Sequence, residues 1–223
     1  ELAGAGAPHG TAVVTREQTK GRGTRGRAWS SGVGGLWLTV VLRPTSAPEL
    51  EGASLRVGLA VAPVLDRALG RDGAVRLKWP NDLVADDRKL GGILCEARWL
   101  GDKPGWLAVG IGINVANAIP ADLATASVSL AELGATVTSD DLVEPVVGAI
   151  LGAGERSGPL DEGELAAFAA RDWLRGRRLA APKPGIAAGI EPDGRLVVRG
   201  DDGSRALVLG SVTLADGLAP GRG

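Results

Sequence analysis

Basic side chains and glycines alternate in one short polar segment near the N-terminus. Its central residues are Lys20, Gly21, Arg22, Gly23, Thr24, Arg25, Gly26 and Arg27. Glycines let backbone N–H groups approach a ligand closely, and guanidinium groups bind phosphate or carboxylate through two parallel hydrogen bonds. The segment therefore predicts a loop that wraps an anionic ligand, with a solvated basic loop as the equally weighted alternative.

Residues 21–26 also match the G-x-G-x-x-G pattern of dinucleotide-binding proteins. That pattern requires an apolar helix directly after the glycines and an acidic ribose ligand about 20 residues further on. Residues 27–32, Arg-Ala-Trp-Ser-Ser-Gly, are not the start of a buried helix. We therefore reject a dinucleotide-binding interpretation of these glycines.

A second group of polar residues surrounds a predicted hairpin. The run Lys78-Trp79-Pro80-Asn81-Asp82 precedes a strand that begins Arg88-Lys89-Leu90-Gly91-Gly92. Two lysines with an amide and a carboxylate between them can surround an anionic ligand, and a glycine pair lets that ligand lie against the strand backbone. The alternative is a surface hairpin with an ordinary tight turn.

A third segment, Gly110 to Val115, reads Gly-Ile-Gly-Ile-Asn-Val. Glycines that alternate within an apolar strand weaken it and mark close approach by a ligand or by another backbone. A tight crossing of two strands explains this pattern equally well.

The elements expected around these segments alternate between strands and helices. Apolar and β-branched runs predict strands at 11–15, 36–42, 75–79 and 106–115, and a hairpin of 83–84 with 92–96 around Asp86-Asp87. Helical spacing predicts a helix from residue 48 that Gly70 ends, and a pair of helices at 140–151 and 162–174. Residues 116–128 are expected to form a loop.

Strand signals return beyond Gly176. Short runs at 186–190, 196–199, 206–209 and 212–214 are separated by turns at 192–194 and 201–203. Several short strands at close spacing predict a small β-barrel. We therefore expect a domain boundary near Gly176, with one domain at residues 1–175 and another at 176–223.

Composition excludes several classes of protein. The formal net charge of -1 over 223 residues argues against a dedicated nucleic-acid binder. One cysteine, Cys95, and one histidine, His9, exclude a disulfide framework, a cysteine-cluster zinc site and Ser-His-Asp chemistry. The longest apolar stretch, 55–65, contains Arg56 and is too short to cross a bilayer. We expect a cytoplasmic protein with no membrane partner.

Together these segments resemble the biotin protein ligase family. Residues 18–29 look like its ligand-binding loop, and residues 78–83 are similar to its KWPND motif. Residues 89–96 resemble its K-L-x-G-I-L-x-E strand and residues 110–115 its G-x-G-x-N segment. Their order and spacing also agree with the family. The resemblance implies an α+β fold: a catalytic domain with a mixed sheet and helices, related to class II aminoacyl-tRNA synthetases, followed by a small SH3-like β-barrel.

The resemblance also implies two reactions. Biotin and ATP, with Mg²⁺, give biotinyl-5′-AMP and pyrophosphate, and the biotinyl group then passes to a lysine of the biotin carboxyl carrier protein domain of an acyl-CoA carboxylase. Because the biotin carboxylate is already ionised at neutral pH, the first reaction needs cations rather than a histidine base. The sequence leaves open whether the chain forms a homodimer.

The resemblance assigns roles to particular residues. The expected catalytic residues are Lys89, which bridges the biotin carboxylate and the α-phosphate, Arg22, which clamps an anion, and Asp82, which orients Lys89 or accepts the proton of the incoming amine. The expected biotin-binding residues are Gln18, Gly21, Arg22, Gly23, Thr24, Lys89, Gly92 and Gly112. The expected ATP- or adenylate-binding residues are Arg25, Arg27, Trp29, Lys78, Asn81 and Asn114. Trp29 lies against adenine or, alternatively, is a buried anchor. No residue is assigned to a protein-bound metal.

Two features depart from the family's pattern. The family has a Ser-Thr-Asn motif some two dozen residues before its conserved glutamine, and Gln18 is too close to Glu1 for that motif, so we expect further residues upstream. Thr24 stands where the family usually has arginine, which predicts weaker retention of the adenylate.

Two other functions remain as alternatives. A lipoate-protein ligase shares the implied fold, but its ligand lacks the ureido ring, and residues 21–27 with 78–82 favour biotin. A biotin-responsive regulator of this family carries a winged-helix domain, which residues 1–223 do not contain.

Overall fold

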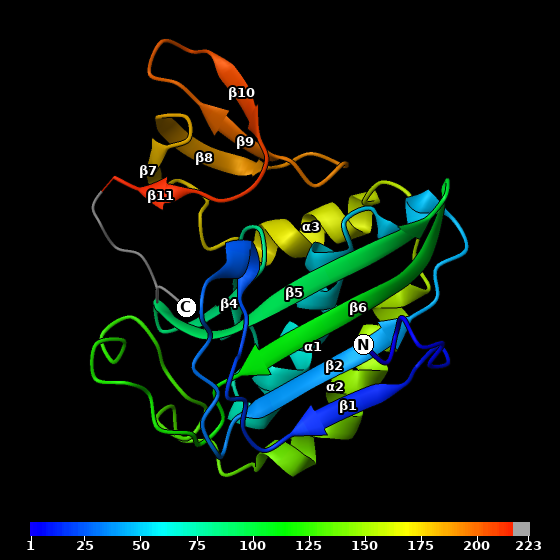
Figure 1. Cartoon of the computed structure of the whole chain (residues 1–223). Coiled ribbons are helices and arrows are strands. Elements are labelled where there is room, and N and C mark those ends of the chain that lie inside the picture. Colours follow the sequence, from blue (N-terminus) through cyan, green and yellow to red (C-terminus); the bar gives the residue numbers. More distant parts are fainter. Residues whose placement is uncertain (216–223) are drawn as a thin grey trace.

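The computed structural model describes residues 1–215 and shows two antiparallel sheets with helices packed against the larger one (Figure 1). The larger sheet has the order β1-β2-β6-β5-β4-β3. Its strands are β1 (Ala12–Thr15), β2 (Leu36–Leu42), β3 (Arg76–Lys78), β4 (Asp82–Ala85), β5 (Arg88–Leu100) and β6 (Lys103–Ile113). After β2 the chain crosses to the far edge of the sheet through a helix and then returns strand by strand until β6 pairs with β2.

The larger sheet is not mixed, which corrects the sequence-based expectation. Every pairing between its named strands is antiparallel. The reason is the length of the connections: β3, β4, β5 and β6 follow one another through short turns, and a short turn can only join antiparallel neighbours. Parallel pairing is limited to isolated bridges, such as Lys89 with Ser127.

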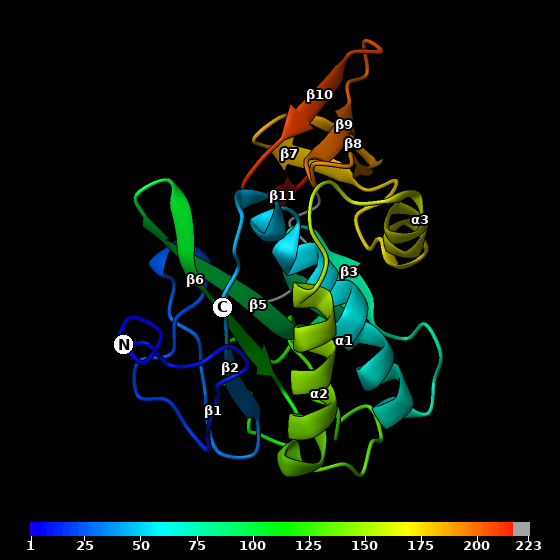
Figure 2. The same ribbon diagram turned by 90° about the vertical axis from the view of Figure 1, so that its right-hand side faces the viewer.

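Three α-helices accompany this sheet in residues 1–215: α1 (Ala53–Leu69), α2 (Ser139–Gly154) and α3 (Glu162–Arg171). Gly70 ends α1 in the left-handed region at φ 63°, as expected of a C-terminal glycine. Thr138 and Asp161 cap α2 and α3 through reciprocal capping boxes. Both later helices pack against α1, and Figure 2 shows α1 and α2 together on one side of the sheet.

The expected strands and helices of this part are present, with ends that differ by a few residues. The largest difference is β5, which extends over 13 residues where the sequence predicted only a short strand. Residues 116–128 form a loop without helix or strand, as predicted.

The two faces of the sheet differ in side-chain size. Leu38, Ile93 and Ile111 are buried on the face that the helices cover. The other face carries Gly92, Gly110 and Gly112, because side chains alternate between faces along each strand. One face therefore forms the hydrophobic core, while the other is left shallow.

The smaller sheet has the order β10-β9-β8-β7-β11. Its strands are β7 (Arg178–Ala181), β8 (Gly185–Ile190), β9 (Leu196–Arg199), β10 (Arg205–Val208) and β11 (Thr213–Leu214). The sequence missed β7. Within residues 1–215 the outer strands, β10 and β11, are not paired with each other, so the predicted barrel does not close there. The last eight residues of the predicted second domain, 216–223, lie outside the described part of the chain.

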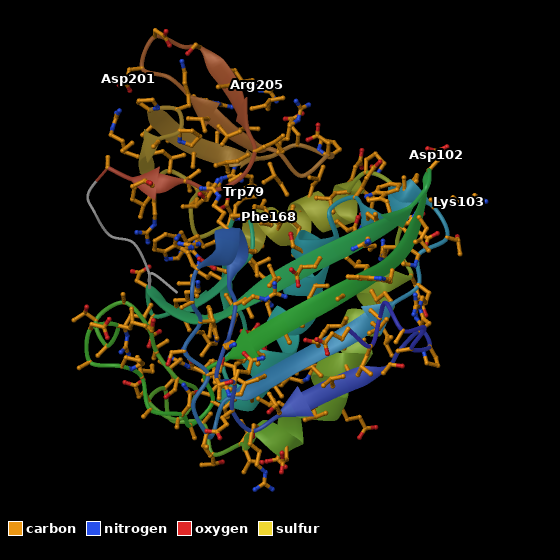
Figure 3. All side chains as sticks on the ribbon, in the orientation of Figure 1. Trp79, Asp102, Lys103, Phe168, Asp201 and Arg205 are labelled. Atoms are coloured by element: carbon orange, nitrogen blue, oxygen red, sulfur yellow. The ribbon has the colours of Figure 1, made fainter. Side chains whose placement is uncertain are left out.

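The two sheets meet beside the Lys78–Asp82 segment. Trp79 is buried and its Nε1 donates a hydrogen bond of 2.8 Å to the carbonyl of Gly194, in the turn between β8 and β9. Trp79 and Phe168 of α3 lie together at this junction (Figure 3). The smaller sheet thus supports the segment that leads into the β4–β5 hairpin.

Candidate functional site

A cavity of about 170 Å³ lies on the face of the larger sheet that the helices leave uncovered. The segment between β1 and β2 borders it, crossing the sheet near the start of β5 and the end of β6 (Figure 1). Among the residues expected at a binding site, the cavity is lined by Gln18, Arg22, Gly23, Thr24, Arg27, Trp29, Asn81, Asp82, Lys89, Gly92 and Gly112. The fold therefore brings three separate sequence segments together around one space.

Glycines form the floor of the cavity because the Trp29 indole lies directly on them. A Cβ atom at Gly112 would stand 2.8 Å from Trp29 Nε1, and one at Gly92 would stand 3.2 Å from the same ring. Only glycine allows this approach without moving the indole. The alternating glycines of β6 thus mark close packing of a side chain in this structure.

A cluster of three charged side chains stands at one end of the cavity. Lys89 Nζ lies 2.9 Å from Asp82 Oδ1, and Lys78 Nζ lies 3.6 Å from Asp82 Oδ2. The β4–β5 hairpin sets this geometry, because it pairs Asp82 with Gly92 and brings Lys89 back beside β4. Burial lowers the pKa of Lys78, and the Asp82 carboxylate acts in the opposite direction. The cluster has one more positive than negative charge and therefore suits an anion.

The Trp29 ring separates this cavity from a second one. Lys89 Nζ lies 4.8 Å from the centre of the ring, and the buried Trp29 Nε1 has no hydrogen-bond partner within residues 1–215. The second cavity, of about 30 Å³, is lined by Trp29, Ser30, Lys89, Asn114, Asn117, Ile119, Pro120, Leu123 and Ser127. Lys89 and Trp29 thus border both cavities.

The glycine- and arginine-rich segment, residues 18–31, forms a narrow two-stranded ribbon between β1 and β2. Gln18 pairs with Ser31 and Arg22 with Ala28 as isolated bridges, and Ser31 Oγ donates a hydrogen bond of 2.7 Å to Gln18 Oε1. Arg22 reaches across the cavity to Glu96, at 3.2 Å. The ribbon therefore carries its guanidinium groups to the cavity while remaining attached to β5.

At the tip of the ribbon, Arg27 donates a hydrogen bond of 3.2 Å to the Thr24 hydroxyl. Arg25 has φ 61°, in the left-handed region, and does not line either cavity. Its guanidinium instead lies beside Gly210, in the connection between β10 and β11.

Three other expected residues lie outside the larger cavity. The Gly21 carbonyl accepts a hydrogen bond of 2.9 Å from the Trp29 backbone within the ribbon. Lys78 stands behind Asp82 and borders a small pocket with Trp79. Asn114 is buried, donates to the Val128 carbonyl at 3.2 Å and lines the second cavity. Asn81 does line the larger cavity, while its Nδ2 donates to the Ile93 carbonyl at 2.8 Å.

Sequence reasoning missed Trp37, Thr39, Glu96, Asn117 and Ser127, which line the two cavities. For Trp37, Thr39 and Glu96, which lie in strands, the alternation of side chains along each strand was a usable signal. In β5, Gly92, Leu94 and Glu96 are spaced by two and share a face, and the same holds for Trp37 and Thr39 in β2. No comparable periodicity exists for Asn117 and Ser127, which belong to the 116–128 loop.

The described residues contain no group of three or more His, Cys, Asp or Glu side chains placed to hold a metal ion. The carboxylates that border the larger cavity, Asp82 and Glu96, are paired with Lys89 and Arg22. These residues therefore do not fit a protein-bound Mg²⁺. Across residues 1–215, none of the helices has the length and apolar character needed to traverse a bilayer.

Comparison with known proteins shows the family of this chain. The model of the biotin/lipoate A/B protein ligase family matches residues 3–114. The biotin–[acetyl-CoA-carboxylase] ligase of Paracoccus denitrificans is 33% identical over 217 residues, which cover 90% of this chain and 88% of that protein. The structure of the biotin protein ligase from Aquifex aeolicus in complex with biotin and ATP has a TM-score of 0.81 and 28% identity, covering 96% of this chain and 93% of that one.

Some relatives are considerably longer. The bifunctional ligase/repressor BirA of Bacillus subtilis is 37% identical over 140 residues, which cover 59% of this chain but only 42% of that protein. The chain therefore spans less than half of the length of that relative, whereas it spans most of the Paracoccus ligase.

Proposed function

Because the chain belongs to the biotin/lipoate A/B protein ligase family, we propose that it is a biotin protein ligase. It would activate biotin with ATP to biotinyl-5′-AMP and transfer the biotinyl group to a lysine of a biotin carboxyl carrier protein. One observation carries this proposal: the Lys89 ammonium borders two adjoining cavities. A cation in that place can hold two anions against each other and stabilise the charge that develops between them.

In the first reaction an oxygen of the biotin carboxylate attacks the α-phosphorus of ATP, and pyrophosphate leaves. Biotin occupies the larger cavity, beside the Trp29 indole, where Gln18, Gly23 and Thr24 also lie. The nucleotide end of the adenylate lies at the second cavity, which Trp29 and Asn114 line. The carboxylate arrives ionised, so this step requires positioning and positive charge and no base.

The remaining cations of the ribbon supplement Lys89. Arg22 and Arg27 line the larger cavity and clamp the carboxylate and the phosphate. Arg25 contacts the nucleotide only after leaving its place beside Gly210. Lys78 acts on the nucleotide side through the electrostatic field of the cluster, because Asp82 stands between it and the cavity.

In the second reaction the neutral amine nitrogen of the carrier lysine attacks the acyl carbon, AMP leaves as the C–O bond breaks, and the proton of the amine passes to solvent water. Both oxygens of Asp82 already face lysine ammonium groups, at 2.9 and 3.6 Å. We therefore assign Asp82 to the orientation of Lys89, in preference to accepting the amine's proton.

The proposal also includes the domain organisation of the chain, its use of Mg²⁺, its compartment and its self-association. Residues 1–175 form a catalytic domain related to class II aminoacyl-tRNA synthetases, and residues 176–223 form an SH3-like domain. Mg²⁺ enters coordinated by the triphosphate, and no reaction step is assigned to it. The protein acts in the cytoplasm on the carrier domain of an acyl-CoA carboxylase. Self-association uses the outer edge of β1, where Val13 and Val14 are 41% and 44% exposed.

Incorporation of radiolabelled biotin into a purified carrier domain, with ATP and Mg²⁺, tests the proposal. We expect label on the carrier in the presence of the chain, and labelling about a hundredfold slower with Lys89→Ala. Lys103→Ala, at the tip of the β5–β6 hairpin (Figure 3), is the matched control and should label normally. Transfer of lipoate in place of biotin would identify the lipoate ligase instead, and specific retardation of DNA without labelling would identify a regulator.

A further inference from the structure

The turn of the β4–β5 hairpin is attached to the segment that leads from α3 into the smaller sheet. Asp87 Oδ1, in the turn, accepts a hydrogen bond of 2.6 Å from Trp173 Nε1 and another of 2.8 Å from Arg177 Nη2. Arg177 Nε donates to the Trp173 carbonyl at 2.9 Å, and its guanidinium carbon lies 3.8 Å from the centre of the Trp173 ring. We call Asp87, Trp173 and Arg177 the turn clamp, because side chains 86 and 90 positions later in the chain hold one carboxylate of the turn.

Trp173 also lies next to Lys78. Helix α3 lies beside β3 (Figure 2), and Asp172, just after α3, forms a parallel bridge with Leu77 of β3. The Trp173 backbone N–H donates to the Leu77 carbonyl at 2.9 Å. Successive side chains alternate between the two faces of a sheet, so Trp173 and Lys78 share the uncovered face. Lys78 Nζ accordingly lies 6.0 Å from the centre of the Trp173 ring.

These contacts close a ring around the charged cluster. Trp173 contacts the hairpin turn through Asp87 and, with the face of its ring, borders Lys78. Lys89 follows Asp87 by two residues, and Asp82 joins Lys89 to Lys78 at 2.9 and 3.6 Å. The turn residues set the pairing of β4 with β5, whereas the turn clamp fixes the position of that turn relative to β3 and Lys78.

We propose that Asp87 and Trp173 are positioning residues for adenylate formation, which hold the hairpin turn so that Lys89 keeps its place beside both cavities. This inference rests on the proposed function. Trp173 is only 2% exposed, and an enclosed indole presents its N–H in one direction. The pair of Asp87 with Arg177 is largely exposed and by itself contributes little to stability. The turn clamp therefore acts mainly on the position of the turn, and a displaced cation lowers the rate because the transition state needs it in one place.

Asp87→Gly is the direct test. Asp87 has φ 59°, a conformation that glycine adopts freely, so the variant removes the carboxylate without straining the turn. Adenylate formation is measured as biotin-dependent exchange of pyrophosphate into ATP. We expect kcat to fall about tenfold, with KM for biotin within about twofold, since the larger cavity is untouched. Trp173→Phe removes the N–H donor and keeps an aromatic ring, so kcat should fall by a similar factor. Because both variants break the same contact, the double variant should be no slower than either single variant.

Asp86→Gly is the matched control, because Asp86 is the other turn residue with positive φ, at 46°, and lies outside the turn clamp. Its carboxylate faces only Arg71, at 3.8 Å on the surface. This variant should exchange pyrophosphate at nearly the wild-type rate. Asp87→Asn keeps an acceptor oxygen and tolerates positive φ, so it should restore most of the kcat that Asp87→Gly loses.

An unchanged kcat in Asp87→Gly, or equal losses in the two glycine variants, would overturn the positioning role. So would a double variant whose losses multiply. Urea denaturation should give the two glycine variants similar midpoints. A lower midpoint in Asp87→Gly alone, together with a kcat that Asp87→Asn does not restore, would make the contact purely structural and also overturn the proposal. A wild-type chain without biotin-dependent exchange would instead reject the proposed function itself.

Discussion

Lys89 and Asp82 face each other across the β4–β5 hairpin, with Nζ 2.9 Å from Oδ1, and both side chains are largely buried. The ion pair restricts the orientation of the Lys89 ammonium group, and Lys89 lines both cavities. Pre-orientation matters here, because a fixed cation stabilises a transition state without first having to reorganise. The pair therefore links the fold of one hairpin to the chemistry proposed above.

Lys89→Ala should reduce adenylate formation about a hundredfold, which corresponds to roughly 3 kcal/mol of transition-state stabilisation. Folding should change little, because Asp82 keeps Lys78 as a partner at 3.6 Å. Biotin-dependent exchange of pyrophosphate into ATP measures the effect, with Lys103→Ala as the control. Exchange near the wild-type rate in Lys89→Ala would reject Lys89 as the central cation.

Asp82→Asn should destabilise the protein most at neutral pH. The folded-state pKa of Lys78 is already lowered by burial, and the Asp82 carboxylate is the largest effect that raises it. Removing the carboxylate lowers this pKa further, so at neutral pH a buried ammonium lacks compensation, at a cost of up to about 3 kcal/mol.

The sign of the pH dependence follows from proton binding. Between the lowered folded-state pKa of Lys78 and its higher unfolded value, the unfolded chain binds more protons, so stability rises with pH in that window. The variant should therefore recover part of its lost free energy of unfolding as pH rises from 7 to about 9.5. Urea denaturation at both pH values measures this, with exposed Asp102→Asn as control. A loss that grows with pH would contradict the assignment.

The sequence was sufficient to predict the hairpin that carries Lys78, Asp82 and Lys89. Asp86-Asp87 forms its turn, and both residues adopt positive φ, which aspartate tolerates better than most residues. A turn of two residues pairs Val84 with Lys89, and a β-bulge between Leu83 and Val84 then pairs Asp82 with Gly92. Residues close together in the sequence therefore determine the geometry of the β4–β5 hairpin.

Thr39 could not be placed at the cavity from sequence alone for the opposite reason. Its strand, β2, pairs with β6, which is distant in the chain, and the alternation within β2 shows only which residues share a face with Thr39. The Trp29 indole presents the same difficulty. Its position over Lys89 depends on how the whole ribbon crosses the sheet, and no local pattern encodes that crossing.

Gly112→Ala should weaken biotin binding about tenfold or more while leaving the fold intact. The added Cβ would stand 2.8 Å from Trp29 Nε1, so the indole must move off the floor and disturb the wall between the cavities. Quenching of tryptophan fluorescence by biotin measures the affinity. Gly148→Ala in α2 is the control, because its Cβ meets no atom within 4 Å. It should bind normally and gain up to about 1 kcal/mol of stability from helix propensity. Equal affinities in the two variants would show that the glycine floor is not required.

Thr24→Arg should slow the release of biotinyl-5′-AMP about tenfold. Thr24 lines the larger cavity and its hydroxyl accepts a hydrogen bond from Arg27. An arginine at this position frees Arg27 from that contact and adds a second charge-assisted hydrogen bond to the bound anion, worth roughly 1.5–3 kcal/mol when desolvated. Gains of this kind appear mainly in the rate of dissociation, and tenfold corresponds to about 1.4 kcal/mol, near the lower end of that range. Stopped-flow measurement of adenylate release is the assay, with Thr24→Gln as a long, uncharged control. Equal rates in the wild type and in Thr24→Arg would show that the side chain at position 24 points away from the adenylate.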